Sequence, residues 1–264
     1  MTDTVIFTVA DGVATLAMNR PERRNSFTIE MADGLLDGLE RAENDPAVRA
    51  VVLTSTGAHW GVGRDNSDTA PPPYPPGDHL QGRTSLLHYT RLVHFMYDMN
   101  TPTIAEMRGG IAGAHLSFAL GCDFRYADTT AVLSTAFVKV AFAGDLGASW
   151  HLTRLVGPTK ARELMLLSPK LRGQEIADRG LVNAVLPPEE LSAKVRETAE
   201  QLASFSPHAV ARTRRNLLAA QTLSLGDYLP LEAETYAWCA ASPDAEEARL
   251  AFVEKRAPRF GTDA

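Results

Sequence analysis

Cysteine is scarce in this sequence and basic residues are outnumbered, and each shortage removes a class of protein from consideration. The two cysteines among 264 residues, Cys122 and Cys239, lie far apart and lack the spacing of metal ligands. A disulfide framework and a structural zinc site are therefore not indicated, and a reducing, cytoplasmic environment is expected. Lys plus Arg number 26 against 32 Asp plus Glu, a formal net charge of −6. Nucleic acid is not an expected partner, and an anionic ligand would have to meet a local basic cluster.

Long apolar runs and two common functional motifs are also missing. The first 13 residues lack the basic start and apolar run of a signal peptide, and no stretch approaches the length of a membrane span, so no membrane partner is expected. The glycines of Gly109–Gly113 do not have the Gly-x-Gly-x-x-Gly spacing of a dinucleotide site, and no Gly-x-Ser-x-Gly elbow occurs. Dinucleotide oxidoreductases and serine hydrolases are thus disfavoured.

What is present is a chain that is 45% hydrophobic and alternates strand and helix patterns in its N-terminal part. Strands are expected at Val5–Val9, Val13–Met18, Val51–Leu53, Thr103–Met107, Phe124–Ala127 and Val132–Thr135. A helix capped by Thr28 should run to Asn44, and another should resume near Thr84. The proline-rich stretch Asp65–Gly82 is expected to be an exposed, mobile loop, and Gly109–Gly113 a tight turn before a buried helix.

Helical patterns dominate after the middle of the chain. They cover Leu146–Val156, Thr159–Leu167, Gln174–Arg179, Pro188–Ser204, Pro207–Gln221 and Leu225–Ala240. The sequence therefore predicts an α/β core over residues 1–195 and a helical region over residues 196–264, whose apolar faces a neighbouring subunit could cover.

Two glycine-rich segments point to a chemical function. Gly57–Asp65 follows the strand Val51–Leu53, and Gly109–Ala114 joins a strand to a helix. The first segment alone could be a loop that needs positive φ angles. The amide of Ala114, however, should lie in the first turn of a helix, where N–H donors and the helix dipole favour an anion. With an unpaired amide near Arg64 it would form an oxyanion hole, in which losing one donor costs about 3–4 kcal/mol of transition-state stabilisation.

Five segments that run along nearly the whole chain carry a family resemblance. They are Asn19–Phe27, Trp60–Asp65, Ile104–Asp123, Gly173–Val185 and Glu254–Phe260. In this order and at these separations they resemble the crotonase superfamily, also called the enoyl-CoA hydratase/isomerase family. The resemblance implies a spiral of ββα units that assembles as a homotrimer or homohexamer. It also implies that the helical C-terminal region serves oligomerisation and closure of the coenzyme A site.

By this resemblance, the amides of Arg64 and Ala114 hold the oxygen of an acyl-CoA thioester and stabilise its enolate. Arg24, Lys255 and Arg256 are expected to meet the phosphates of coenzyme A, since basic side chains suit phosphate. An ordinary solvated charge is the alternative for Arg24. The candidate side chains of the acyl pocket are Trp60, His115, Ser117 and Phe137, and Trp60 could instead belong to the core. No metal or redox cofactor is implied. Coenzyme A is part of the substrate and is not counted as a cofactor.

Both catalytic glutamates of the family's hydratases are absent, since Ser117 and Phe137 occupy their positions. Neither residue replaces the general acid and base of water addition. Asp145 stands where isomerases that resemble this chain keep an aspartate, and one carboxylate can move a proton between two carbons. Asp145 could instead cap a helix that begins at Leu146. A dehalogenase is disfavoured, because Thr90 occupies the position of its histidine.

The sequence therefore predicts an enoyl-CoA isomerase of fatty or aromatic acyl-CoA metabolism, with Asp145 as the catalytic residue. An atypical hydratase and a non-catalytic acyl-CoA-binding homologue stay open as alternatives. His115 is either a space-filling core residue or a catalyst. Glu106 and Arg108 either pair with each other or reach the acyl pocket.

Overall fold

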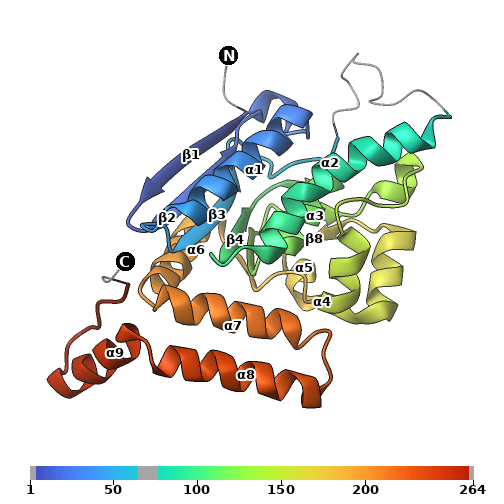
Figure 1. Ribbon diagram of the computed structural model, residues 1–264. Coiled ribbons are helices and arrows are strands. Elements are labelled where there is room, and N and C mark those ends of the chain that lie inside the picture. Colours follow the sequence, from blue (N-terminus) through green and yellow to red (C-terminus); the bar gives the residue numbers. More distant parts are fainter. Residues whose placement is uncertain (1–3, 65–76, 262–264) are drawn as a thin grey trace.

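Strands and helices alternate along most of the chain, and further helices extend from its C-terminal end (Figure 1). The computed structural model describes residues 4–64 and 77–261. The strands are β1 (Val5–Ala10), β2 (Val13–Met18), β3 (Ala50–Ser55), β4 (Thr103–Met107), β5 (Gly110–Ala112), β6 (Phe124–Asp128), β7 (Val132–Ser134), β8 (Leu171–Arg172) and β9 (Ala184–Leu186). The helices are α1 (Ile29–Asn44), α2 (His79–Asp98), α3 (Ala114–Gly121), α4 (Ala148–Arg162), α5 (Gln174–Asp178), α6 (Pro188–Ala203), α7 (Pro207–Ala219), α8 (Leu225–Ala240) and α9 (Pro243–Glu254).

The first elements confirm the two expected strands and the helix that follows them. β1 and β2 pair antiparallel across a turn in which Gly12 adopts a φ of 77°. α1 begins after Thr28, whose side chain accepts a hydrogen bond from the N–H of Met31 at 3.2 Å. Met31, Leu35 and Leu39 are buried on one face of α1, as their spacing of four residues requires.

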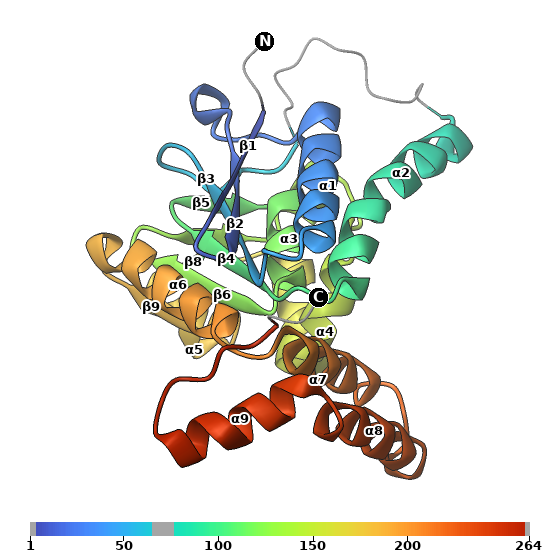
Figure 2. The same cartoon turned by 60° about the vertical axis from the view of Figure 1, so that its left-hand side comes forward.

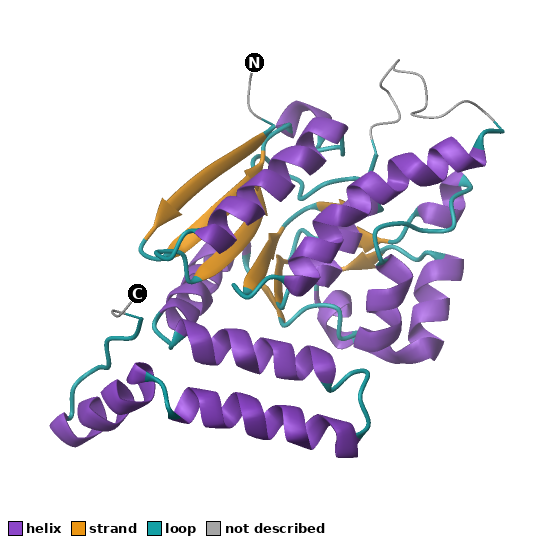
Figure 3. Ribbon diagram, in the orientation of Figure 1, coloured by secondary structure: helices purple, strands orange, loops and turns teal. Residues whose placement is uncertain are grey.

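Two sheets form the core (Figure 3). The larger has the strand order β1-β2-β3-β4-β6-β9 and is parallel except for the β1–β2 pair, and the smaller has the order β5-β7-β8. In the units β4-β5-α3 and β6-β7-α4, the first strand joins the larger sheet and the second joins the smaller. These repeats form the expected spiral of ββα units.

Both faces of the larger sheet are covered, as is usual for parallel strands. On β3, Val51 and Leu53 point into a core cluster with α1, α2, α3 and α4. Ala50 and Val52 alternate with them and face a second cluster, which α6 covers. The end of β3 therefore leads into a loop that is held between well-packed layers.

The helices α7, α8 and α9 lie outside these layers, on one side of the core (Figure 2). The division expected between residues 195 and 196 falls inside α6, which packs on the sheet as one helix, so the outlying helices begin at Pro207. None of the helices in the described ranges combines the length and apolar composition that a membrane crossing requires.

Three expectations about single elements are wrong, one about the type of an element and two about where a helix begins. Gly110–Ala112 forms β5, not a tight turn, because it pairs in parallel with β7. α2 begins at His79, capped by Asp78, so the end of the stretch Asp65–Gly82 is helical, while residues 65–76 of the expected loop lie outside the described residues. α4 begins at Ala148, two residues later than expected.

Candidate active site

The two glycine-rich segments lie side by side in the structure. The segment after β3 runs parallel to β5, with an isolated parallel bridge between Gly61 and Ile111. Three backbone hydrogen bonds join the segments. The N–H of Trp60 donates to the carbonyl of Arg108 (2.8 Å), that of Gly61 to the carbonyl of Gly110 (3.0 Å), and that of Ala112 to the carbonyl of Gly61 (3.0 Å). The first glycine segment therefore extends the smaller sheet beside β5.

Both segments end in glycine turns that touch each other. Gly63 has a φ of 87° and Gly113 a φ of 57°, values that favour glycine. A Cβ added to Gly113 would lie 3.3 Å from the Cα of Gly63, so a side chain there would force the turns apart. Arg64 and Ala114 follow these turns directly along the chain.

The N–H groups after the two turns are available as donors. Phe27 donates to the carbonyl of Gly63 at 2.8 Å, a contact in which the N–H of Arg64 takes no part. Ala114 is the first residue of α3, where N–H groups have no partner within the helix. Among the residues that the structure describes, neither N–H bonds to a carbonyl of another segment. Two donors thus stand near one place, one of them at the positive end of a helix.

Asn25 and His59 fasten the first turn, and sequence reasoning assigned a role to neither. Asn25 is fully buried, and its Nδ2 donates to the carbonyls of Thr56 (2.9 Å) and His59 (2.7 Å). The Nδ1 atom of His59 accepts a hydrogen bond from the N–H of Gly110 at 2.9 Å. The only signal in the sequence was that Asn25 lies within a segment that carries the family resemblance.

His115 and Trp60 are both packed in the core beside the first turn, one of the two places left open for each of them. Both are fully buried, and Trp60 donates from Nε1 to the carbonyl of His115 at 3.1 Å. Trp60 belongs to the apolar core, and the His115 ring packs edge-on against Phe27 and Phe118. Burial lowers the pKa of His115 to about 3, so the ring is neutral.

Two buried side chains contact both the second turn and the segment that contains Asp145. The Oγ atom of Ser117 is 3.4 Å from the carbonyl oxygen of Gly113 and 3.1 Å from that of Asp145. The Phe137 ring packs against both glycine positions, because a Cβ added at Gly113 or at Gly144 would lie 3.9 Å or 3.8 Å from it. Ser117 and Phe137 therefore connect the Ala114 end of α3 to the segment of Asp145.

The carboxyl group of Asp145 is partly buried and does not cap α4. That helix has Gly147 at its N-cap and no side-chain cap, so the capping alternative is wrong. The Oδ1 atom is buried and has no hydrogen-bond partner in the described part of the chain. Burial raises the pKa of Asp145 to about 6, an effect that the Ser117 hydroxyl opposes. A carboxyl with these properties can exchange protons near neutral pH.

The basic residues expected to bind coenzyme A are exposed, but they lie on separate parts of one chain. Arg24 precedes α1, and Lys255 ends α9, which Figure 1 shows at the opposite end of the molecule from the start of α1. Arg256 already pairs with Glu247 and with Glu254, each at 2.6 Å. One chain therefore does not gather these three cations into a single cluster.

Glu106 and Arg108 pair with each other, which settles the two roles left open for them. An oxygen of Glu106 contacts a guanidinium nitrogen of Arg108 and accepts a hydrogen bond from Ser192 of α6 at 2.7 Å. The pair thus ties the end of β4 to α6.

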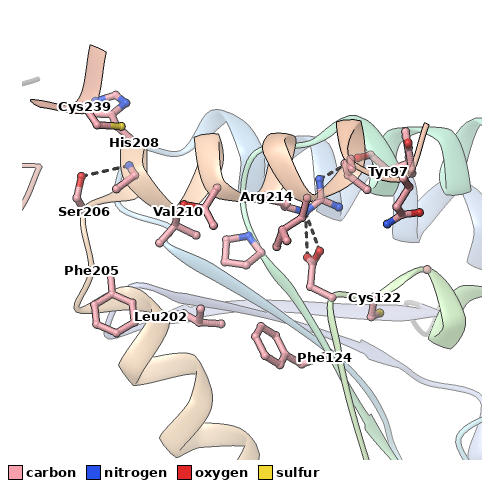
Figure 4. Close-up of a pocket in the computed structure, with 18 of the residues that line it drawn as sticks. Tyr97, Cys122, Phe124, Leu202, Phe205, Ser206, His208, Val210, Arg214 and Cys239 are labelled. Carbon is pink, nitrogen blue, oxygen red and sulfur yellow. Dashed lines mark hydrogen bonds and ion pairs between the residues drawn. The ribbon is translucent and has the colours of Figure 1, made fainter. Parts of the chain in front are cut away.

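A cavity of about 1370 Å³ lies between the core and the outlying helices (Figure 4). Its lining is mainly apolar and includes Phe124, Leu202, Phe205 and Val210. None of the residues beside the two glycine turns lines it. The cavity therefore belongs to the junction with α7 and not to the candidate site.

Comparisons with known proteins agree with the fold. The sequence profile of the enoyl-CoA hydratase/isomerase family matches residues 8–263. The chain is 32% identical over 260 residues to the 1,2-epoxyphenylacetyl-CoA isomerase of Escherichia coli, covering 98% of this chain and 99% of that one. It is 32% identical over 200 residues to the 4-chlorobenzoyl coenzyme A dehalogenase-2 of Arthrobacter sp, covering 75% and 71% of the two chains.

The crystal structure of an enoyl-CoA hydratase from Bacillus anthracis has the same fold, with a TM-score of 0.90 at 27% identity over 97% of this chain and 98% of that one. These relatives are named for three different reactions, so they identify the family and leave the reaction to be argued from the site. The chain belongs to the enoyl-CoA hydratase/isomerase family, the crotonase superfamily.

Proposed function

We propose that the protein is an enoyl-CoA isomerase that shifts the double bond of an acyl-CoA thioester. The observation that carries this proposal is the carboxyl group of Asp145, which is partly buried, lacks a partner for Oδ1 among the described residues and has a pKa raised to about 6. It lies near the second glycine turn, and by the family resemblance Ser117 and Phe137 stand where a hydratase has the two carboxylates that water addition would need.

In the proposed reaction, the carboxylate of Asp145 removes a proton from the α carbon of a β,γ-unsaturated acyl-CoA. The electron pair of the broken C–H bond moves toward the thioester oxygen, where the amides of Arg64 and Ala114 stabilise the negative charge. The protonated Asp145 then returns the proton to the γ carbon, which forms the α,β-unsaturated thioester and restores the carboxylate. No water molecule is consumed.

The neighbours of Asp145 support proton transfer over hydration. The ring of Phe137 cannot transfer a proton, and the Ser117 hydroxyl lies within hydrogen-bond distance of two backbone carbonyls. Neither residue is free to activate water. The name of the E. coli relative, 1,2-epoxyphenylacetyl-CoA isomerase, is in line with an isomerase and with an aromatic acyl group.

The substrate and the assembly form part of the same proposal. Arg24 and Lys255 are exposed cations that would meet the phosphates of coenzyme A, and Arg256 would have to leave its carboxylate partners to do so. Because Arg24 and α9 lie apart within one chain, a homotrimer or homohexamer would let the helical region of one subunit close the coenzyme A site of another. A cytoplasmic location fits the cysteine usage.

The decisive experiment replaces Asp145 by asparagine and follows hydrogen exchange. Straight-chain, branched and aromatic enoyl-CoAs are incubated in D2O, and deuterium at the α and γ carbons is measured by mass spectrometry. We expect exchange by the wild-type protein and a loss of about 10²- to 10⁴-fold in Asp145→Asn, with thioester binding retained. Asp37→Asn is the control, because Asp37 is exposed on α1 and makes only a 3.9 Å contact with Arg41.

Each alternative gives a different result in these assays. A non-catalytic acyl-CoA binder would bind the thioesters and show no exchange in the wild-type protein. A hydratase would incorporate oxygen from H2¹⁸O into the product. Either result would contradict the isomerase proposal.

A further inference from the structure

His115 is a buried side chain that the proposed reaction does not use. It follows Ala114 directly in α3, and its Nδ1 atom accepts a hydrogen bond from the N–H of Gly63 at 3.2 Å. Its own carbonyl accepts the bond from Trp60. One residue therefore links the turn before the first oxyanion donor to the helix that carries the second.

The imidazole has no room to turn away from Gly63. A Cβ added to Gly61 would lie 2.0 Å from the Cδ2 atom of the ring, so the missing side chain at Gly61 provides the space that the ring occupies. The rings of Phe27 and Phe118 pack edge-on against it, each with a centroid separation of 5.7 Å. The orientation of Nδ1 is thus fixed by packing.

The charge state of the ring keeps the contact intact. Because Nδ1 accepts, the proton of the neutral ring is assigned to Nε2. Burial lowers the pKa of His115 to about 3, so the acceptor persists at neutral pH. The backbone of Asn25 acts on the ring in the opposite direction and raises the pKa, but burial has the larger effect.

We infer that His115 is a positioning residue that holds Gly63 so that the next amide, that of Arg64, points at the same thioester oxygen as the amide of Ala114. The inference rests on the proposed function. Gly63 needs such support, because glycine at a φ of 87° has wide conformational freedom. A displaced donor loses most of its effect, since oxyanion holes act through preorganised geometry.

Three substitutions separate the hydrogen bond from the packing. His115→Asn places an amide oxygen near the position of Nδ1, whereas His115→Gln carries the same group one carbon further, toward the position of Nε2. His115→Leu keeps an apolar volume without an acceptor. His94→Asn is the matched control, because His94 is exposed on α2 and its Nδ1 contacts the carboxylate of Asp98 on the same helix, at 3.0 Å.

The probe is crotonyl-CoA labelled with ¹³C at its carbonyl. Its infrared carbonyl band reports polarisation in the site, and exchange of its γ hydrogens in D2O reports turnover. We expect the wild-type protein to lower the band frequency on binding, and His115→Asn and His94→Asn to keep this shift. We expect His115→Gln and His115→Leu to lose much of the shift and to lower kcat by about 10- to 100-fold, with little change in KM.

The results distinguish the inference from the function beneath it. No band shift and no exchange in the wild-type protein would overturn the proposed function itself. A wild-type shift that all His115 variants retain would overturn only the inference. Equal losses in His115→Asn and His115→Gln would overturn it as well, because packing of the ring would then be responsible. If His115→Leu fails to fold, the comparison of His115→Asn with His115→Gln still tests whether the hydrogen bond to Gly63 is responsible.

Discussion

At the scale of single residues, the base role proposed for Asp145 sets the activity and the stability of the protein against each other. Its carboxyl group is partly buried, and burial raises its pKa from 3.8 to about 6. It is therefore mainly ionised at neutral pH, as a base must be, yet it is poorly solvated in that form. The same shift that makes the carboxylate a useful base makes its charge unfavourable for the folded state.

The pH dependence of turnover should follow the ionisation of Asp145. Because only the carboxylate accepts a proton, kcat/KM for deuterium exchange should rise with pH through about 6 and level off above it. A pH–rate profile from pH 4.5 to 8.5 measures this directly. A rate that is flat across this range, or that falls as Asp145 ionises, would contradict its role as the base.

The stability of the wild-type protein, compared with that of Asp145→Asn, should change with pH in the opposite sense. In the wild-type protein, the raised pKa favours folding fully below pH 3.8, and this contribution is lost as pH rises to about 6. Asparagine carries no such charge, so above pH 6 the variant should be more stable by about 1–3 kcal/mol. Urea unfolding at pH 4 and pH 8 checks the difference. An Asp145→Asn protein that is less stable at pH 8 would argue against the burial of this charge.

Removal of one oxyanion donor should abolish turnover without disturbing the helix. Ala114 is the first residue of α3, a position at which proline is well tolerated because its N–H has no helical partner. Ala114→Pro deletes this N–H and fills its place with a ring carbon, so we expect a loss of at least about 100-fold in kcat. The α-helical circular dichroism and the binding of free coenzyme A should persist. Turnover near the wild-type rate would exclude the amide of Ala114 from the mechanism.

How far the site could be predicted from sequence differs between residues. Arg64, Ala114 and Asp145 stand in local patterns, namely glycine turns and a carboxylate within a family motif. The bond from Gly63 to His115 joins residues 52 positions apart and depends on how Gly61 and two phenylalanine rings pack. Trp60 was left open between the acyl pocket and the core for a similar reason, since sequence alone does not tell which face of a loop meets the core.

At the scale of elements, boundaries set by local chemistry were predictable and those set by distant pairing were not. Thr28 caps α1 as expected, because an N-cap is a contact over three residues. β5 was expected to be a tight turn, and its partner β7 lies about 20 residues further along the chain. A three-residue strand has too little pattern to reveal such a partner.

The junction between α7 and the core depends on one buried guanidinium. Arg214 donates from Nε to Asp123 at 2.9 Å (Figure 4). Its terminal nitrogens donate to the carbonyls of Met96, Tyr97 and Met99. Arg214 thus supplies hydrogen-bond donors to carbonyls at the end of α2 and holds α7 beside that end.

We expect Arg214→Ala to lower the free energy of unfolding by about 3–5 kcal/mol, because Asp123 and three carbonyls lose their partner in a buried site. The neighbouring Arg215 is exposed on the same helix, and Arg215→Ala should change stability by less than about 0.5 kcal/mol. Guanidinium unfolding of both variants makes the comparison. Equal stabilities would show that the contacts of Arg214 do not hold α7 in place.

At the scale of the whole molecule, the outlying helices present apolar side chains that a single chain leaves exposed. Tyr236 is 75% exposed on α8, and Phe252 and Val253 are 85% and 67% exposed on α9. No side chain of α8 is buried in the described chain. Such faces are characteristic of subunit contacts, in line with the proposed homotrimer or homohexamer.

The protein should therefore run at three or six times the 28.6 kDa mass of one chain in size-exclusion chromatography with light scattering. Phe252→Asp combined with Val253→Asp should shift it toward smaller species, because charge would enter an apolar contact. Arg249→Ala on the same helix alters only an exposed pair with Glu246 and should leave the mass unchanged. A wild-type protein that is monomeric at micromolar concentration would contradict the assembly.

The central claim is that the amides of residues 64 and 114 share one thioester oxygen. A crystal structure of the protein with butyryl-CoA, a saturated thioester that has no double bond to shift, tests it most directly. The account predicts that both nitrogens lie about 2.7–3.1 Å from the carbonyl oxygen, with the carboxylate of Asp145 facing the α carbon. A thioester oxygen that contacts only one of these amides, or a side chain or solvent instead, would contradict the account.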